Sequence, residues 1–333
     1  MRVAKRERSV KSRNPEKGAV TFLLTRASKN LTKKARRKAV SKSLAGGLLK
    51  VSQNGVMTKS YKRTYEVCNE RMFQTNGQMH TAYCGNRFCL VCGNYRQMRM
   101  WLSYGRQISE WKNQCYMVSL TIPNVKGIEL RSTLQLMHKR FRYCWHHMRH
   151  KEGLDVQLVR ATEITYSKKH NTYHPHLHVL CKGKRQAVRL MKNWLQRWPD
   201  AKSVAQDIRQ ADKNAVYEVF KYCAKLGTDT RSVDGYMEVV PMRNLNTIYT
   251  AARGLRLWSV AGLRSALGKE VNEEEELDID QTTPAVKRLG DELVWEWSEM
   301  MTDWIDYDTG DTLADYTPSE KVKRFMKNIQ ESC

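Results

Sequence analysis

Two histidines separated by one apolar residue, His176 and His178 on either side of Leu177, lie in residues 172–181, a stretch typical of a β-strand. Side chains alternate between the two faces of a strand, so both imidazoles point to one face, while Leu177 and Val179 point toward a core. Imidazole is the commonest protein ligand of metal ions, so this pair predicts a metal site.

The preceding strand offers a third ligand. Residues 156–166 and 173–181 are expected to be strands, and a polar linker of turn type joins them. In a hairpin centred near residues 169–170, Glu163 lies directly opposite His176, and cross-strand neighbours are ~4.5–5.5 Å apart. A carboxylate and two imidazoles with open coordination positions suit Mg²⁺ or Mn²⁺ acting on a phosphate.

A candidate nucleophile follows. Residues 213–226 are expected to form a helix that ends at Gly227, and Glu218 and Tyr222 share one face of it. A tyrosine is a weak nucleophile at neutral pH, but a metal-polarised phosphate would help it, as would Lys221 and Lys225 stabilising the phenolate and the transition state. Attack on DNA would leave a 5′-phosphotyrosine and a free 3′-OH.

Glu218 could then activate a water molecule or an incoming 3′-OH for a second transfer. Tyr217 is a rival nucleophile, but it precedes Tyr222 by five residues, about 500° around a helix, so the two hydroxyls cannot share a face. We prefer Tyr222, which has flanking lysines and Glu218 on its side.

A cysteine cluster precedes the predicted strands. Cys84, Cys89 and Cys92 have the short spacing of metal ligands, and Cys68 upstream completes a four-thiolate zinc site, with His80 as a substitute for one ligand. The neighbouring arginines would let this module contact DNA phosphates; they are Arg87, Arg96 and Arg99. Other cysteines are expected in the core: Cys115, Cys144, Cys181 and Cys223.

The charge is high and uneven. The 333 residues carry 58 Lys and Arg against 34 Asp and Glu, a net charge of +24, which is too basic for an ordinary enzyme of small metabolites and indicates a polyanionic partner. Residues 266–333 hold 18 acids and 7 bases, a net of −11, so residues 1–265 carry +35. This asymmetry is typical of a nucleic-acid-binding body with an acidic appendage.

The sequence also indicates the cellular compartment of the protein. No apolar run reaches the ~18–20 residues needed to span a bilayer, and no apolar segment follows the basic N-terminus as in a secretory signal. The nine cysteines are an odd number with close pairs, which indicates metal ligands in a reducing cytoplasm rather than disulfides.

From residue 115 the pattern is that of a globular α+β domain. Strands are expected at 115–122, 156–166, 173–181 and 236–240, and helices at 130–149, 186–198 and 213–226. This order predicts an antiparallel sheet with helices on one face. Basic and aromatic residues crowd the end of the helix at 130–149 and could stack unpaired bases, although core packing is the commoner role of such rings.

Three segments resemble, in order, the motifs of rolling-circle replication initiators of the HUH endonuclease superfamily, specifically the plasmid Rep proteins with one catalytic tyrosine. They are Ser119-Leu120-Thr121-Ile122-Pro123-Asn124, His174-Pro175-His176-Leu177-His178-Val179-Leu180 and Glu218-x-x-Lys221-Tyr222-x-x-Lys225. The segment from Cys84 to Cys92 is also similar to one seen in many of these proteins, although Leu90 stands where many have proline.

The resemblance implies a site-specific DNA nickase and strand transferase that opens one strand of a double-strand origin in a prokaryotic cell. By position, His176 and His178 are metal ligands, Glu163 matches the acidic position of the neighbouring strand, Tyr222 is the nucleophile and Glu218 helps to end a replication round. Because the sequence lacks a G-x-x-x-x-G-K-[ST] motif, a separate helicase is expected to unwind the duplex.

We therefore expect a basic flexible or partly helical arm at 1–60, a zinc module at 61–114, an HUH nickase domain at 115–265 and an acidic region at 266–333. A single-tyrosine transposase or relaxase, and a zinc-containing DNA-binding regulator without catalysis, remain alternatives. The origin sequence, nick site, physiological metal, type of replicon and oligomeric state stay open, as do the roles of the arm and the acidic region.

Overall fold

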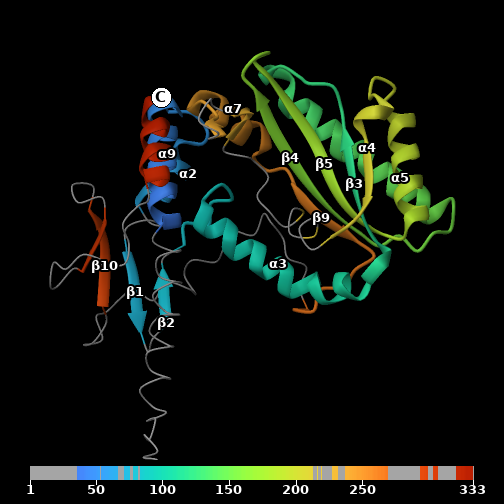
Figure 1. Cartoon of the computed structure of the whole chain (residues 1–333), viewed down its shortest axis with the longest axis horizontal. Helices are drawn as coiled ribbons and strands as arrows, with labels where there is room; N and C mark the ends of the chain where they lie inside the picture. Colours follow the sequence, from blue (N-terminus) through green and yellow to red (C-terminus); the bar gives the residue numbers. More distant parts are fainter. Residues whose placement is uncertain are drawn as a thin grey trace, which may run out of the picture.

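The architecture comes from a computed structural model. It describes residues 36–52, 54–66, 71–75, 78–81, 83–212, 216, 219, 227–231, 237–268, 293–298, 303–306 and 320–332. Figure 1 shows a central sheet with helices around it and a group of smaller elements at the other end of the molecule. The expected helix at 213–226 lies outside the described residues except for Val216 and Val219, which are helical.

A five-stranded antiparallel sheet organises the chain. Its order is β6 (Asp207–Gln210), β3 (Cys115–Thr121), β5 (Thr172–Lys182), β4 (Leu158–Ser167) and β9 (Trp258–Ala261). The hairpin of β4 and β5 has the register expected from the sequence, with Glu163 opposite His176. The prediction of a mixed helix-and-strand fold around an antiparallel sheet is thus confirmed.

One face of the sheet packs on α4 (Leu130–His150), α5 (Lys184–Arg197) and α7 (Met242–Ala252). The sheet contributes alternate residues such as Leu120, Leu177 and Val179, none of which is exposed to solvent. The apolar positions expected to face the core from α4 are buried, apart from half-buried Trp145. Three of the predicted core cysteines, Cys115, Cys144 and Cys181, are buried as expected.

The opposite face is also covered, so the expectation of helices on one face only is wrong. Met100, Tyr104 and Ile108 of α3 (Leu90–Glu110) pack in one hydrophobic cluster with sheet residues such as Met117 and Leu180. Helix α3 lies in the predicted zinc module, whose packing against the sheet could not be read from local periodicity. The helix leads through η1 (Lys112–Gln114) directly into β3.

The N-terminal part of the described chain joins the main core. Residues 36–52 are helical, and Leu44 and Leu48 belong to the same cluster as the strands β3 to β5. Helices α2 (Thr58–Glu66) and α9 (Glu320–Glu331) also contribute to this cluster. Residues 36–60, which we expected in a basic arm, therefore include an ordered and partly buried helix.

A second sheet joins distant parts of the sequence. Its order is β11 (Asp303–Asp306), β10 (Leu293–Ser298), β1 (Arg71–Thr75) and β2 (Gln78–Thr81). Strands of the expected acidic region thus pair with a hairpin of the cysteine module. The short strand expected near 236–240 is β8 (Met237–Val239), which pairs with β7 (Gly227–Arg231) rather than with the central sheet. Among the described residues, no helix has the length and apolar character needed to cross a bilayer.

Candidate metal centre

Strand register brings the predicted ligands to one face of the sheet. Glu163 of β4 lies opposite His176 of β5, and Ser119 of β3 lies opposite His178. Directly paired residues of an antiparallel sheet point to the same side. The two imidazoles, the carboxylate and the serine hydroxyl therefore share the face that α3 packs against, not the face that α4 and α5 cover.

Three potential ligand atoms converge on this face. The Nε2 atom of His178 lies 2.9 Å from Oε2 of Glu163, and Nε2 of His176 lies 3.4 Å from the same oxygen. The two Nε2 atoms are 3.1 Å apart. Glu163 and His176 are buried, and the His178 side chain is 18 % exposed, so the group is largely shielded from solvent.

The outer ring nitrogens explain why the inner ones converge. Nδ1 of His176 lies 3.2 Å from the main-chain oxygen of His174, which can only accept. In a neutral ring this contact favours the hydrogen on Nδ1, which leaves the lone pair on Nε2. Nδ1 of His178 lies 3.3 Å from the hydroxyl oxygen of Ser119. Metal-bound histidines characteristically hold their second nitrogen in this way.

The donor set fits a divalent cation. An anionic carboxylate and an imidazole lone pair lie in a largely buried position, where uncompensated negative charge and unpaired acceptors are costly. A proton on His178 could serve only part of this set, whereas a cation at its centre contacts all three atoms. Glu163, His176 and His178 therefore form a group that could hold a metal ion, as the sequence predicted.

Two polar residues near the metal centre, Gln206 and Asp207, were not predicted from the sequence. The side chain of Gln206 bridges the end of β3: its Oε1 accepts from the Thr121 main-chain N–H at 2.7 Å, and its Nε2 donates to the Thr121 hydroxyl at 3.0 Å. Thr121 is the partner of His176 in the sheet, so this contact fixes the strand end beside the ligands. Asp207 of β6 lies opposite Ser119 on the same face. No local pattern pointed to β6, which has a single apolar residue.

The predicted nucleophile and its helpers lie outside the described residues; they are Tyr222, Glu218, Lys221 and Lys225. The chain on either side of them is described. Val219 is fully buried in the cluster that contains Ala161 and Leu180, on the face of the sheet that carries the ligands. Ala161 is the sheet partner of His178. Strand β7, which begins at Gly227, lies against β4.

A second group of possible metal ligands comprises Cys84, Cys89 and Cys92, all of them buried. The sulfur atoms of Cys84 and Cys92 are 3.6 Å apart. Cys89 directly precedes α3 and Cys92 lies in its first turn, where the positive end of the helix dipole stabilises thiolates. The fourth predicted ligand, Cys68, lies outside the described residues, as does the side chain of its substitute His80.

Two of the three arginines beside this cluster donate to main-chain oxygens of the protein. The Arg87 guanidinium donates to the main-chain oxygens of Ala252 and Leu255 at the end of α7. Arg96 is 9 % exposed and donates to the main-chain oxygen of Gly85. Carbonyl groups at a helix C-terminus attract cations, so Arg87 joins the cysteine segment to the end of α7.

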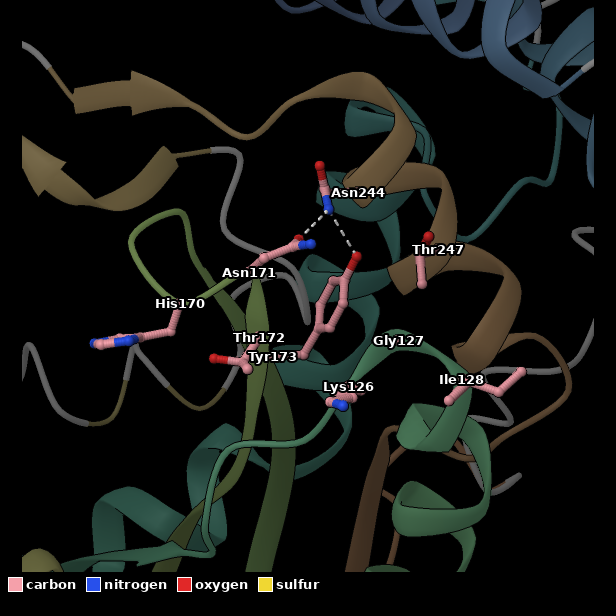
Figure 2. Close-up of a pocket in the computed structure, with 9 residues that line it drawn as sticks. All are labelled: Lys126, Gly127, Ile128, His170, Asn171, Thr172, Tyr173, Asn244 and Thr247. Carbon is pink, nitrogen blue, oxygen red and sulfur yellow. Dashed lines mark hydrogen bonds between the residues drawn. The ribbon is translucent and has the colours of Figure 1, made fainter.

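A shallow pocket lies at the tip of the β4–β5 hairpin (Figure 2). The Asn244 amide nitrogen donates to the Tyr173 hydroxyl at 3.0 Å and lies 3.5 Å from Oδ1 of Asn171. Tyr173 belongs to the core on the α4 side of the sheet, so this pocket is separate from the metal centre. Its polar contacts attach the hairpin tip to α7.

Comparison with known proteins identifies the family. The model of the replication protein family, Rep_1, matches residues 75–306, which include both groups of possible metal ligands except Cys68. The chain therefore belongs to this family, and the resemblance to plasmid rolling-circle initiators is confirmed. No solved structure matches the chain.

Curated relatives support the same family. A "Protein rep" from Bacillus amyloliquefaciens is 28% identical over 249 residues, which cover 64% of this chain and 70% of the relative. A "Protein rep" from Staphylococcus aureus is 32% identical over 164 residues, covering 43% of this chain and 69% of the relative. A "Protein rep" from Bacillus sp is 28% identical over 268 residues, covering 69% and 83%. The chain is thus a replication initiator of the Rep family.

The contact between Ser119 and His178 gives a first prediction. Replacing Ser119 by alanine removes the hydroxyl that orients the ring, so Mn²⁺ affinity measured by isothermal titration calorimetry should fall by about 10- to 100-fold. Ser119→Thr keeps a hydroxyl and should restore most of the affinity. Equal Mn²⁺ affinity in the alanine variant and the original protein would show that the serine does not position a ligand.

Proposed function

We propose that this Rep protein nicks one strand of a double-strand origin, using a tyrosine nucleophile and a divalent metal ion on an HUH-type sheet. The observation that carries the proposal is the convergence of Glu163, His176 and His178 on one point with their ligand atoms facing inward. DNA is the polyanion that a replication initiator with a net charge of +24 would bind.

The bound ion, Mg²⁺ or Mn²⁺, would polarise the scissile phosphate. The Tyr222 oxygen attacks the phosphorus, a new P–O bond to the tyrosine forms, and the bond to the 3′ oxygen breaks. The phenolic proton is lost and the departing 3′ oxygen gains one, which leaves a 5′-phosphotyrosine and a 3′-OH that primes synthesis. Lys221 and Lys225 stabilise the charge that develops on the phenolate and the phosphate.

The position of Val219 supports Tyr222 as the nucleophile. Val219, three residues before Tyr222, is buried on the face that carries the ligands, so the chain near Tyr222 reaches that face. Strand β7 then returns the chain to β4, the strand that carries Glu163. Glu218 would activate a water or a second 3′-OH when a replication round ends.

A covalent-adduct assay tests the proposal. The full chain is incubated with labelled single-stranded origin DNA and Mn²⁺, and the protein is separated on a denaturing gel. The original protein and Tyr217→Phe should both form an adduct, whereas Tyr222→Phe should form none because it lacks the attacking oxygen. EDTA or Glu163→Gln should reduce adduct formation by at least about 100-fold.

The same assay separates the alternatives. A regulator that binds DNA without cutting gives no adduct with any variant, which would refute the nickase. An adduct that persists in Tyr222→Phe and disappears in Tyr217→Phe would assign the nucleophile to the other tyrosine. A single-tyrosine transposase or relaxase also forms an adduct, but on transposon ends or transfer origins, so mapping the cut phosphate on the replicon excludes it. A separate helicase would then unwind the duplex beyond the nick.

We further propose that Cys84, Cys89 and Cys92, with Cys68 as fourth ligand, hold a structural zinc ion. The three described sulfur atoms are buried and close together at the start of α3. This helix packs on the sheet face that carries the metal centre, so a fixed helix start would also stabilise that face.

Zinc content checks this proposal. Cys89→Ser should lose the zinc that mass spectrometry detects in the purified protein, because a hydroxyl is a poor zinc ligand. Cys144→Ser is the matched control: burial raises the pKa of Cys144 to about 12, so it remains a thiol in the core and its replacement should leave zinc in place. Absence of zinc from the original protein would refute the assignment.

A further inference from the structure

Helices α4 and α5 carry no acidic residue. Each contains five lysines or arginines, and together with α7 they form the layer that covers the sheet face opposite the metal centre. They run antiparallel: Arg140 lies over the Trp198 ring at 4.2 Å, and the Asn193 amide donates to the Cys144 main-chain oxygen at 3.5 Å. Figure 1 shows this pair at the end of the molecule away from α2 and α9.

Seven of these cations are exposed, and one of them, Arg131, donates to the main-chain oxygens of Ala251 and Arg253. We call the other six, three on each helix, the basic surface: Lys139, Arg142, Arg149, Lys184, Arg185 and Lys192. None of the six forms an ion pair or a hydrogen bond with another described side chain. The carboxylate in the turn after α4, Glu152, is held by Arg189 at 2.6 Å and lies 3.4 Å from His147. The basic surface therefore keeps its positive charge for an external partner.

Three aromatic rings near the end of α4 pack against one another, whereas Tyr143 is exposed. The His146 ring stacks on the Trp145 ring at a centroid distance of 4.0 Å and on the His150 ring at 5.3 Å, so these three rings contact one another. Partial burial and the nearby His150, Arg142 and Arg149 lower the pKa of His146. Lysines and arginines carry the charge of this surface, and such groups supply many of the contacts that proteins make with DNA phosphates.

We propose that the basic surface binds the phosphate backbone of duplex DNA, on the opposite side of the sheet from the metal centre. The inference extends the proposed nicking function, because one molecule would hold a duplex segment of the origin on one face while the strand to be cut reaches the other. Duplex binding at this surface requires neither metal nor tyrosine, so it can be tested without cleavage.

The test measures binding of the full chain to a short labelled duplex of arbitrary sequence, by fluorescence anisotropy in EDTA over a series of salt concentrations. The variant Lys139→Gln/Arg185→Gln/Lys192→Gln should lose three phosphate contacts. Each contact contributes about 0.9 to the magnitude of the slope of log affinity against log salt concentration, so that magnitude should decrease by about 2.7. At low salt its affinity should fall by about tenfold or more.

A control variant removes the same charge elsewhere. Lys59→Gln/Lys323→Gln/Lys327→Gln changes exposed lysines of α2 and α9, and its slope should change by less than about one. Adduct formation on a single-stranded oligonucleotide should be unchanged in both variants, which separates this inference from the proposed nicking reaction. An equal loss of duplex affinity in both triple variants overturns the proposal. A loss of single-strand binding as large as that of duplex binding also overturns it, since the surface would then be a single-strand groove.

Discussion

The convergence of three electron-pair donors on one sheet face is the constraint around which the rest of the structure is arranged. Nε2 of His176, Nε2 of His178 and Oε2 of Glu163 all lie within 3.4 Å of one another. Such a group is costly in a buried position unless a cation compensates it. The backbone oxygen of His174 and the hydroxyl of Ser119 hold the rings in this arrangement, so the neighbouring strands determine the ligand geometry.

The sheet is built to keep these strands in place. The longest pairing is that of β4 with β5, and β3 and β9 extend it on either side. Gln206 fixes the end of β3, and Arg87 attaches the cysteine segment to the end of α7. The two faces then differ in kind: one combines the metal centre with the apolar packing of α3, and the other presents a layer of helices whose outside is positively charged.

The sequence predicted the ligand geometry but not its surroundings. Glu163 could be placed opposite His176 because a short polar linker fixes the register of a hairpin, and the alternation of side chains then decides the face. The same reasoning failed for β6, where Ile208 alone among four residues is apolar, and for α3, whose contact with the sheet depends on chain segments far from it. It also did not predict the contact of Arg87 with the end of α7, because nothing local shows that a helix C-terminus lies within its reach. Tyr222 and Cys68 stay predictions.

The central claim can be tested most directly by diffraction from crystals of the protein grown with Mn²⁺, with data collected at the manganese absorption edge. The account predicts an anomalous peak about 2.1 Å from the inner nitrogens of His176 and His178 and from a Glu163 oxygen. A saturating Mn²⁺ concentration with no peak at these three side chains, or a peak coordinated by other residues alone, would contradict it.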